Sequence, residues 1–155
     1  MTSERSTTAK EPTLVVGLGE TGLACARFLE RAGEPFEVVD SRREPPGLAA
    51  FRERWPRVRL SLGPFDRRQF TRARRVVVSP GVSLREPALA AAAEAGVECI
   101  GDIELFARTA DAPVVAITGS NGKSTVTAMT GALLEAAGYD VRTGGNLGPP
   151  ALDLL

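Results

Sequence analysis

One glycine-rich segment, residues 114–125 (VVAITGSNGKST), has the residue types and the spacing needed to hold a triphosphate. The apolar, β-branched run at 114–117 predicts a buried parallel strand, and the residues from Ser124 onward predict a helix. Glycines between them allow backbone N–H groups to approach phosphate oxygens, and the helix N-terminus adds free N–H groups and a positive dipole end. The residues of this predicted triphosphate-binding loop are Gly119, Ser120, Asn121, Gly122, Lys123, Ser124 and Thr125.

Within this loop, Lys123 is the candidate catalytic residue and Ser124 is the candidate metal ligand. A lysine at this position can reach the β and γ phosphates of ATP, and the hydroxyl that follows can coordinate Mg²⁺. Of the 19 Lys and Arg residues only Lys10 and Lys123 are lysines, so a compact ammonium occurs where a point charge suits phosphate. The loop is the short G-x-x-G-K-S form, with Ile117 where the longer pattern has its first glycine. The alternative is a glycine-rich turn before a helix that holds no ligand.

A second glycine-rich segment, GLGETG at residues 17–22, lies between a predicted strand at 13–16 and a predicted helix at 23–32. The next predicted strand, at 36–39, ends at Asp40. This order of strand, glycine turn, helix, strand and acid is the nucleotide-binding fingerprint of doubly wound sheets, in which the acid accepts a hydrogen bond from a ribose hydroxyl. The alternative is a tight turn that needs glycine only for packing.

Strands and helices are predicted to alternate along the rest of the chain, so the fold class is α/β with a Rossmann-like parallel sheet. Residues 41–75 contain short elements and many arginines, which we interpret as a solvated face and not as a nucleic-acid surface, because aromatic residues are sparse. A strand at 75–78 leads to Ser79-Pro80-Gly81, which is either a simple turn or part of the edge where such sheets bind ligands. The other predicted elements are a capping box at 83–86 that starts a helix at 86–95, a strand at 97–100, helices at 103–108 and 124–137, a strand at 139–143 and a helix from 151.

The composition is that of an ordinary soluble globular protein, with 155 residues, a formal net charge of zero and 43% hydrophobic residues. No apolar run reaches the ~20 residues needed to span a bilayer, and the N-terminus lacks the pattern of a secretory signal, so we expect a cytoplasmic protein without a membrane partner. Cys25 and Cys99 are expected to be buried, reduced thiols. The absence of histidine excludes a histidine base and histidine metal ligands.

Six segments, in their order and spacing, resemble the bacterial Mur ligases: GLGETG, VVDSR, VVVSPGV, GDIELF, AITGSNGKST and GGNLGPPAL. The chain is most similar to the branch of this family that adds D-glutamate to UDP-N-acetylmuramoyl-L-alanine. The resemblance implies a disordered leader at 1–11, a Rossmann-like domain for the UDP precursor at 12–109, and the incomplete start of a P-loop ATP-binding domain at 110–155. The contacts it implies for the UDP precursor come from Gly19, Glu20, Thr21, Asp40, Ser41, Arg42, Ser79, Pro80, Gly81 and Asn146.

The activity implied by this resemblance is amide-bond formation that depends on ATP and Mg²⁺, through an acyl phosphate that the amine of D-glutamate attacks, in peptidoglycan precursor synthesis. Such a reaction depends on positioning and on neutralising negative charge. Members of the family have a whole central ATPase domain and a third domain. We therefore expect the chain to be the amino-terminal part of a monomeric ligase with small-molecule substrates, and to be inactive alone. The alternatives are an NAD-dependent oxidoreductase domain, which leaves Lys123 unexplained, and a non-catalytic nucleotide-binding module.

Overall fold

The computed structural model describes residues 11–146 and 148–155, and the chain divides into two compact units, Met1–Ile100 and Gly101–Leu155. The expected leader lies outside the described residues except for Glu11, and so does Leu147 of the turn at 144–148. The sequence predicted a domain boundary after residue 109, whereas the chain divides into its two units between residues 100 and 101. The division into two functional domains stays a prediction.

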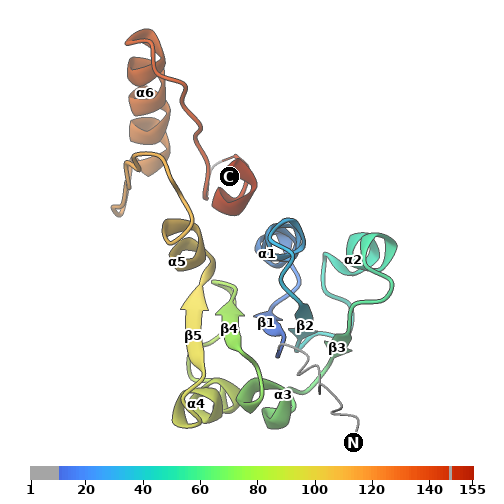
Figure 1. Ribbon diagram of the computed structural model, residues 1–155. Helices are drawn as coiled ribbons and strands as arrows, with labels where there is room; N and C mark the ends of the chain where they lie inside the picture. Colours follow the sequence, from blue (N-terminus) through green and yellow to red (C-terminus); the bar gives the residue numbers. More distant parts are fainter. Residues whose placement is uncertain (1–10, 147) are drawn as a thin grey trace, which may run out of the picture. The chain divides into compact units, whose positions relative to one another are not determined.

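The first unit is built on a five-stranded sheet in the order β3-β2-β1-β4-β5 (Figure 1). Its strands are β1 (Thr13–Val16), β2 (Phe36–Asp40), β3 (Leu60–Leu62), β4 (Arg75–Val78) and β5 (Glu98–Gly101). β1 pairs in parallel with both β2 and β4, and β2 pairs in parallel with β3. The α/β class and the parallel sheet are thus confirmed, and the strands predicted at 13–16 and 75–78 are present with the predicted bounds.

Helices cover both faces of this sheet. They are α1 (Glu20–Arg31), α2 (Leu48–Arg54), α3 (Arg67–Thr71) and α4 (Pro87–Glu94). Figure 1 shows α1 and α2 on the opposite side of the strands from α3 and α4. A parallel sheet covered on both faces explains why its strands are near-continuous runs of β-branched and other apolar residues.

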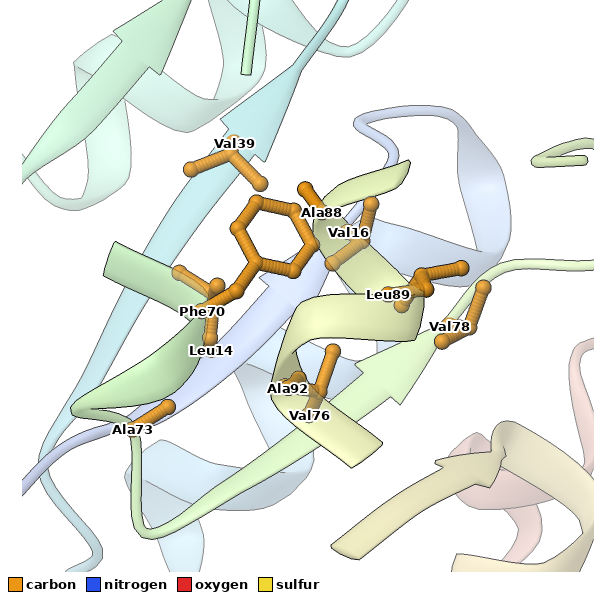
Figure 2. Packing of buried hydrophobic residues seen from close by; sticks show 10 residues of the cluster. All are labelled: Leu14, Val16, Val39, Phe70, Ala73, Val76, Val78, Ala88, Leu89 and Ala92. Carbon is orange, nitrogen blue, oxygen red and sulfur yellow. The ribbon is translucent and has the colours of Figure 1, made fainter. Parts of the chain in front are cut away.

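One hydrophobic cluster fills the space between the sheet and helices α3 and α4 (Figure 2). Successive strand residues point to opposite faces, so Leu14 and Val16 enter this cluster while Val15 is buried on the other face. Phe70 of α3, with no exposed surface, packs among them. The cluster consists of Leu14, Val16, Val39, Phe70, Ala73, Val76, Val78, Ala88, Leu89 and Ala92. Its burial fixes β1, β2 and β4 against one another, and therefore the loops that follow them.

The start of α4 differs from the predicted capping box. The N-cap is Glu86, and Pro87 takes the first helical position, which suits proline because the N–H that it lacks has no intrahelical acceptor there. The Ser83 hydroxyl accepts a hydrogen bond of 3.2 Å from the Arg85 N–H, in a local turn that precedes the helix. The prediction that Ser83 caps this helix was therefore wrong.

The second unit contains α5 (Asp102–Ala107), α6 (Lys123–Ala136) and a short 3₁₀ helix, η1 (Ala151–Leu154), where the sequence predicted an α-helix. α5 packs against η1, and Leu105 of α5 and Leu152 of η1 are buried. Thr143 passes close to α6 at Gly131, where a Cβ atom would lie 2.9 Å from the threonine methyl group.

The strands predicted at 114–117 and 139–143 are wrong for the described structure, because both segments are irregular. A strand exists only when its N–H and C=O groups pair with a neighbour. Among the described residues of the second unit no such neighbour is present, and Val114 and Val115 are 56% and 63% exposed. The apolar pattern at 114–117 therefore predicted neither the strand nor its burial correctly.

Candidate nucleotide-binding sites

The glycine turn at 17–22, the residues after β2 and the residues after β4 meet at one edge of the sheet. The Gly17 N–H donates to the Val39 carbonyl at 2.8 Å, and the Ser79 N–H donates to the Val16 carbonyl at 2.9 Å. The Ser79 hydroxyl also reaches the Gly17 carbonyl, at 3.5 Å. β1 lies between β2 and β4, and the strand order reverses between β1 and β4. The carboxyl ends of the strands at such a reversal are the position at which open α/β sheets bind ligands.

Each of the three glycines in this turn has a different spatial requirement. Gly17 has φ of +99°, and a Cβ there would lie 2.9 Å from the Cβ and Oγ atoms of Ser79. A Cβ on Gly22 would overlap the Gly17 carbonyl oxygen. Gly19, the N-cap of α1, has open space where its Cβ would be. Gly17 and Gly22 therefore allow the turn to close, whereas Gly19 leaves room for a group outside the protein.

Asp40 ends β2 beside this turn, and its side chain is almost fully buried. One carboxylate oxygen accepts from the Leu18 N–H and from Arg42 Nη2, each at 2.7 Å. The other accepts from the Arg42 N–H at 2.8 Å and from Arg42 Nε at 2.9 Å. Burial raises the pKa of Asp40, but the hydrogen bonds from Arg42 and Leu18 outweigh it, so the pKa lies below its ordinary value. The carboxylate is therefore held in its charged form.

Nine of the ten residues predicted to contact the UDP precursor belong to the first unit, and all nine lie in these three segments. Glu20 opens α1 and is exposed, and Gly19 and Thr21 beside it are partly buried. Ser41 and Arg42 are exposed after β2, and Ser79, Pro80 and Gly81 follow β4 with Ser79 partly buried. Asn146 is an exposed residue of the second unit. Sequence reasoning missed Leu18, whose backbone N–H binds Asp40, because a backbone partner leaves no mark on residue type.

The second glycine-rich loop, residues 119–125, precedes α6. Gly119 and Gly122 have φ of +150° and +74°, which L-residues with side chains rarely adopt, and Gly122 is the N-cap of the helix. The helix begins at Lys123, one residue earlier than predicted, and Lys123 Nζ donates to the Gly119 carbonyl at 2.6 Å. The ammonium thus lies over its own loop, beside N–H groups of the first helical turn that have no intrahelical acceptor. Glycine conformation, cation and helix N-terminus all suit an ATP phosphate chain.

Other features of the described residues bear on the earlier expectations. Cys25 is buried as predicted, but Cys99 is exposed, so the prediction of two buried thiols is half wrong. β5 lies at the edge of the sheet and is exposed at Glu98 and Cys99, which explains the difference. No helix among the described residues is both long and apolar enough to cross a membrane. Nor do these residues gather three or more His, Cys, Asp or Glu side chains in a cluster that could hold a metal ion.

Comparison with known proteins shows the family of the chain through a family model and through its relatives in sequence. A family model described as "Mur ligase MurD-like, N-terminal domain" matches residues 11–101. The UDP-N-acetylmuramoylalanine--D-glutamate ligases of Marinobacter nauticus and Pseudomonas aeruginosa are 54% and 55% identical to the chain, over 143 and 142 residues. Each alignment covers 92% of this chain but only 32% of the relative, so the chain spans about a third of the length of these enzymes.

Among solved structures, UDP-N-acetylmuramate:L-alanyl-gamma-D-glutamyl-meso-diaminopimelate ligase from Neisseria meningitides aligns with a TM-score of 0.56. The alignment covers 92% of this chain and 46% of that chain, at 20% sequence identity. This is a likeness of fold.

Proposed function

The chain belongs to the family of Mur ligase MurD-like N-terminal domains, and on this basis we propose that its first unit binds the UDP end of UDP-N-acetylmuramoyl-L-alanine. The observation that carries the proposal is the meeting of the glycine turn, the Asp40–Arg42 segment and the Ser79–Gly81 segment at one edge of the sheet. The N-terminus of α1, a 12-residue helix, points its first N–H groups and its positive dipole end toward this edge, which favours a diphosphate. Open space at Gly19 allows a phosphate to approach the backbone.

In this proposal the glycine turn borders the diphosphate and the residues after β2 border the uridine. The contacts to the diphosphate come from Gly19, Glu20 and Thr21. The contacts on the uridine side come from Asp40, Ser41 and Arg42. The Ser79–Gly81 segment lines the same site, since Ser79 already contacts the turn through Gly17. Asn146 is proposed as a further contact of the precursor from the second unit.

We propose that residues 119–125 hold ATP, with Lys123 beside the β and γ phosphates and Ser124 as a ligand of Mg²⁺. When bound, ATP supplies the phosphoryl group that activates a carboxylate. Lys123 and the loop N–H groups neutralise negative charge, and the left-handed glycines keep side chains out of the space that phosphate oxygens need. The whole ligase is then an ADP-forming, monomeric cytoplasmic enzyme that joins the alanyl carboxylate of the precursor to the amine of D-glutamate.

Calorimetric titration of the 155-residue chain with UDP-N-acetylmuramoyl-L-alanine tests the first half of the proposal. We expect saturable binding that UDP competes away and that NAD at the same concentration leaves unchanged. Tight binding of NAD, together with no binding of the precursor, would contradict the proposal and would favour an oxidoreductase domain.

The ATP half can be tested by fusing this chain to the remaining part of the Pseudomonas aeruginosa relative and measuring ADP and the D-glutamyl product. Lys123→Ala should lower the rate by about 100-fold or more, because it removes the positive charge next to the transferred phosphoryl group. Lys10→Ala is the matched control, since Lys10 is the chain's other lysine, and it should leave the rate unchanged. An active fusion that keeps its rate after Lys123→Ala would show that the loop has been misassigned.

A further inference from the structure

We propose that an arginine cluster at the amino end of the sheet, made of Arg59, Arg72, Arg74 and Arg75, binds a phosphate-bearing anion. The cluster lies at the opposite end of the strands from the candidate nucleotide-binding edge, so the inference is independent of the proposed function. Its starting point is a concentration of charge. Residues 51–75 contain nine arginines and only two acidic residues, in a chain whose formal net charge is zero. A surface with one sign of charge attracts a partner of the opposite sign.

Backbone hydrogen bonds bring the segments of the cluster together where the strands begin. Arg59 immediately precedes β3, and Arg75 is the first residue of β4. The Arg59 carbonyl accepts from the Val38 N–H of β2 at 3.0 Å. The Arg74 N–H donates to the carbonyl of Pro12, just before β1, at 3.1 Å. Because the paired strands are parallel, these segments all lie at the same end of the sheet.

Two glutamates hold the arginines at this end, and Glu37 of β2 holds the first pair. Arg72, which follows α3, donates from Nη2 to both carboxylate oxygens of Glu37, at 3.2 and 3.3 Å. Arg59 Nε lies 3.9 Å from one of the same oxygens. One carboxylate is therefore shared by two guanidinium groups.

Glu34, just before β2, is shared in the same way by the second pair. Arg75 Nη2 donates to one of its carboxylate oxygens at 2.7 Å, and Arg74 Nη1 lies 3.7 Å from that oxygen. Four guanidinium groups thus contact two carboxylates, which leaves two positive charges in excess. A phosphate group carries nearly two negative charges at neutral pH, so one such group matches the excess, whereas one carboxylate would neutralise only half of it.

The cluster also has donors that its glutamates do not use. Arg59 and Arg74 are 54% and 48% exposed, and their contacts with the carboxylates are too long to be hydrogen bonds. Their planar forks of N–H groups suit the paired oxygens of a phosphate. In addition, Arg75 Nε and the Thr13 hydroxyl are buried and have no hydrogen-bond partner among the described residues. Thr13 and Arg75 are partners in neighbouring strands, so two unsatisfied donors share one face of the sheet at this end.

The phosphate group can come from a free anion in solution or from a lipid headgroup. None of the large apolar side chains that are exposed in the described part of the chain lies within residues 51–75. The cluster would therefore hold a membrane by its headgroups alone, without an inserted apolar anchor. The same lack of exposed aromatic side chains removes the stacking platforms that single-stranded nucleic acids need.

The anion can be located by the protection of arginines from a dicarbonyl reagent, read peptide by peptide by mass spectrometry in the 155-residue chain. Inorganic pyrophosphate, at about ten times its dissociation constant, should slow the modification of Arg59 and Arg74 by about tenfold. Arg52 is the internal control, since it is exposed in the same basic segment but lies outside the cluster, and its rate should not change. Vesicles of phosphatidylglycerol, compared with vesicles of phosphatidylcholine, test the lipid source by the same protection.

A double variant tests whether the arginines act together. In a chain with both Arg59→Ala and Arg74→Ala, half-maximal protection of Arg72 should need about tenfold more pyrophosphate, because two charge-assisted contacts are lost. Arg52→Ala is the matched control and should leave this concentration unchanged. The ion pairs removed are exposed and long, so the double variant should keep nearly the wild-type Tm. The protection measurement itself uses the wild-type chain and stands whether or not the double variant folds.

Protection by pyrophosphate alone would support a free anion, and protection by phosphatidylglycerol but not by phosphatidylcholine would support a lipid headgroup. Three results would overturn the proposal. The first is no protection by either probe, and the second is equal protection of Arg52, which would show unspecific attraction. The third is equal protection by polyglutamate at the same concentration of charge, which would favour an acidic protein segment over phosphate. Because each result is read at the arginines themselves, none depends on whether the turn at 17–22 binds UDP.

Discussion

Adding one methyl group at Gly22 should damage the fold, whereas adding one at Gly19 should damage mainly ligand binding. A Cβ on Gly22 would overlap the Gly17 carbonyl oxygen and would lie 3.0 Å from the carbonyl carbon. These are backbone atoms, and the Gly17 N–H is held by the Val39 carbonyl at 2.8 Å, so the turn cannot move aside without breaking its junction with the sheet. At Gly19 the corresponding space is empty, and φ of −105° is accessible to alanine.

The expected magnitude follows from two opposing effects. Alanine replacing a helical glycine stabilises by about 0.5–1 kcal/mol. Overpacking costs about 1–3 kcal/mol, and a clash with backbone places Gly22→Ala at or above the upper end of that range. The net loss is about 2 kcal/mol, which lowers Tm by about 10 °C for a unit of roughly 100 residues. Gly19→Ala changes an N-cap and should cost only about 0.5 kcal/mol.

Thermal unfolding and UDP titration of both variants measure the two effects separately. Gly22→Ala should show the large fall in Tm, and Gly19→Ala should keep nearly the wild-type Tm but bind UDP more weakly. A Tm for Gly22→Ala within about 2 °C of wild type would refute the reasoning, since that interval corresponds to well under 1 kcal/mol. So would a Gly19→Ala variant that is equally destabilised.

Three further predictions follow from burial and charge. Phe70→Ala should lower the free energy of unfolding by about 3–5 kcal/mol in a urea titration, while a loss below 1 kcal/mol would contradict the packing in Figure 2. The pKa of Asp40 in the folded chain lies below its unfolded value of 3.8. The ionised carboxylate therefore stabilises the folded state above pH 3.8, and this stabilisation is lost as the pH falls through the lower pKa of the folded chain. Asp40→Asn should therefore show a shallower acid-induced loss of stability, and an unchanged slope would argue against a depressed pKa. Cys99 is exposed and should react with a disulfide reagent in the folded chain, whereas the buried Cys25 should react only after unfolding. Partial burial and the charge of Glu98 raise the pKa of the Cys99 thiol, so the rate of its reaction should still rise at alkaline pH. A fast reaction phase that persists in Cys99→Ser would contradict the assignment of that phase to Cys99.

The strands β1 and β4 could be predicted with their bounds because their side chains are buried on both faces of the sheet. A run such as residues 75–78 needs β-branched residues throughout when helices cover both sides of the sheet, and this is a signal that the sequence carries locally. Residues 41–75 carry no comparable signal, and α2, β3 and α3, which are 7, 3 and 5 residues long, lie within them. Their positions depend on aromatic contacts between elements, such as Phe36 against Trp55 at 6.0 Å between ring centroids.

In the candidate site, too, the features that the local sequence specifies could be predicted, and the side-chain partners could not. The glycine spacing and the acid after β2 place Gly19 and Asp40 correctly at one edge of the sheet, because parallel strands end on the same side. The partners of Asp40 could not be predicted, because an acid in this position is equally suited to a ribose hydroxyl or to an arginine two residues away. Only the side-chain torsions of Asp40 and Arg42 decide between these, and the sequence does not specify them.

The two glycine-rich loops also differ in how firmly their own unit holds them, and this difference gives a last prediction. The turn at 17–22 is fixed through Leu18, whose N–H and C=O are both bonded and which has no exposed surface. The loop at 119–125 follows an unpaired segment at 114–117, is exposed at Ser120, Asn121 and Gly122, and is spanned by the Lys123–Gly119 contact at 2.6 Å.

Hydrogen exchange read by mass spectrometry should therefore be slow over residues 13–18 and fast over residues 114–122, because only the first set of amides is buried and bonded within a sheet. UDP should slow hydrogen exchange further in the turn at 17–22 and leave exchange in the loop at 119–125 unchanged. ATP with Mg²⁺ should slow exchange in the loop at 119–125 and leave exchange in the turn at 17–22 unchanged. The comparison needs no catalytic activity, since each peptide reports the ligand that its own loop holds. Equal protection of residues 114–117 and of β1 in the ligand-free chain would contradict this prediction. It would show that residues 114–117 pair with a neighbouring strand, and that the loop at 119–125 is held as firmly as the turn at 17–22.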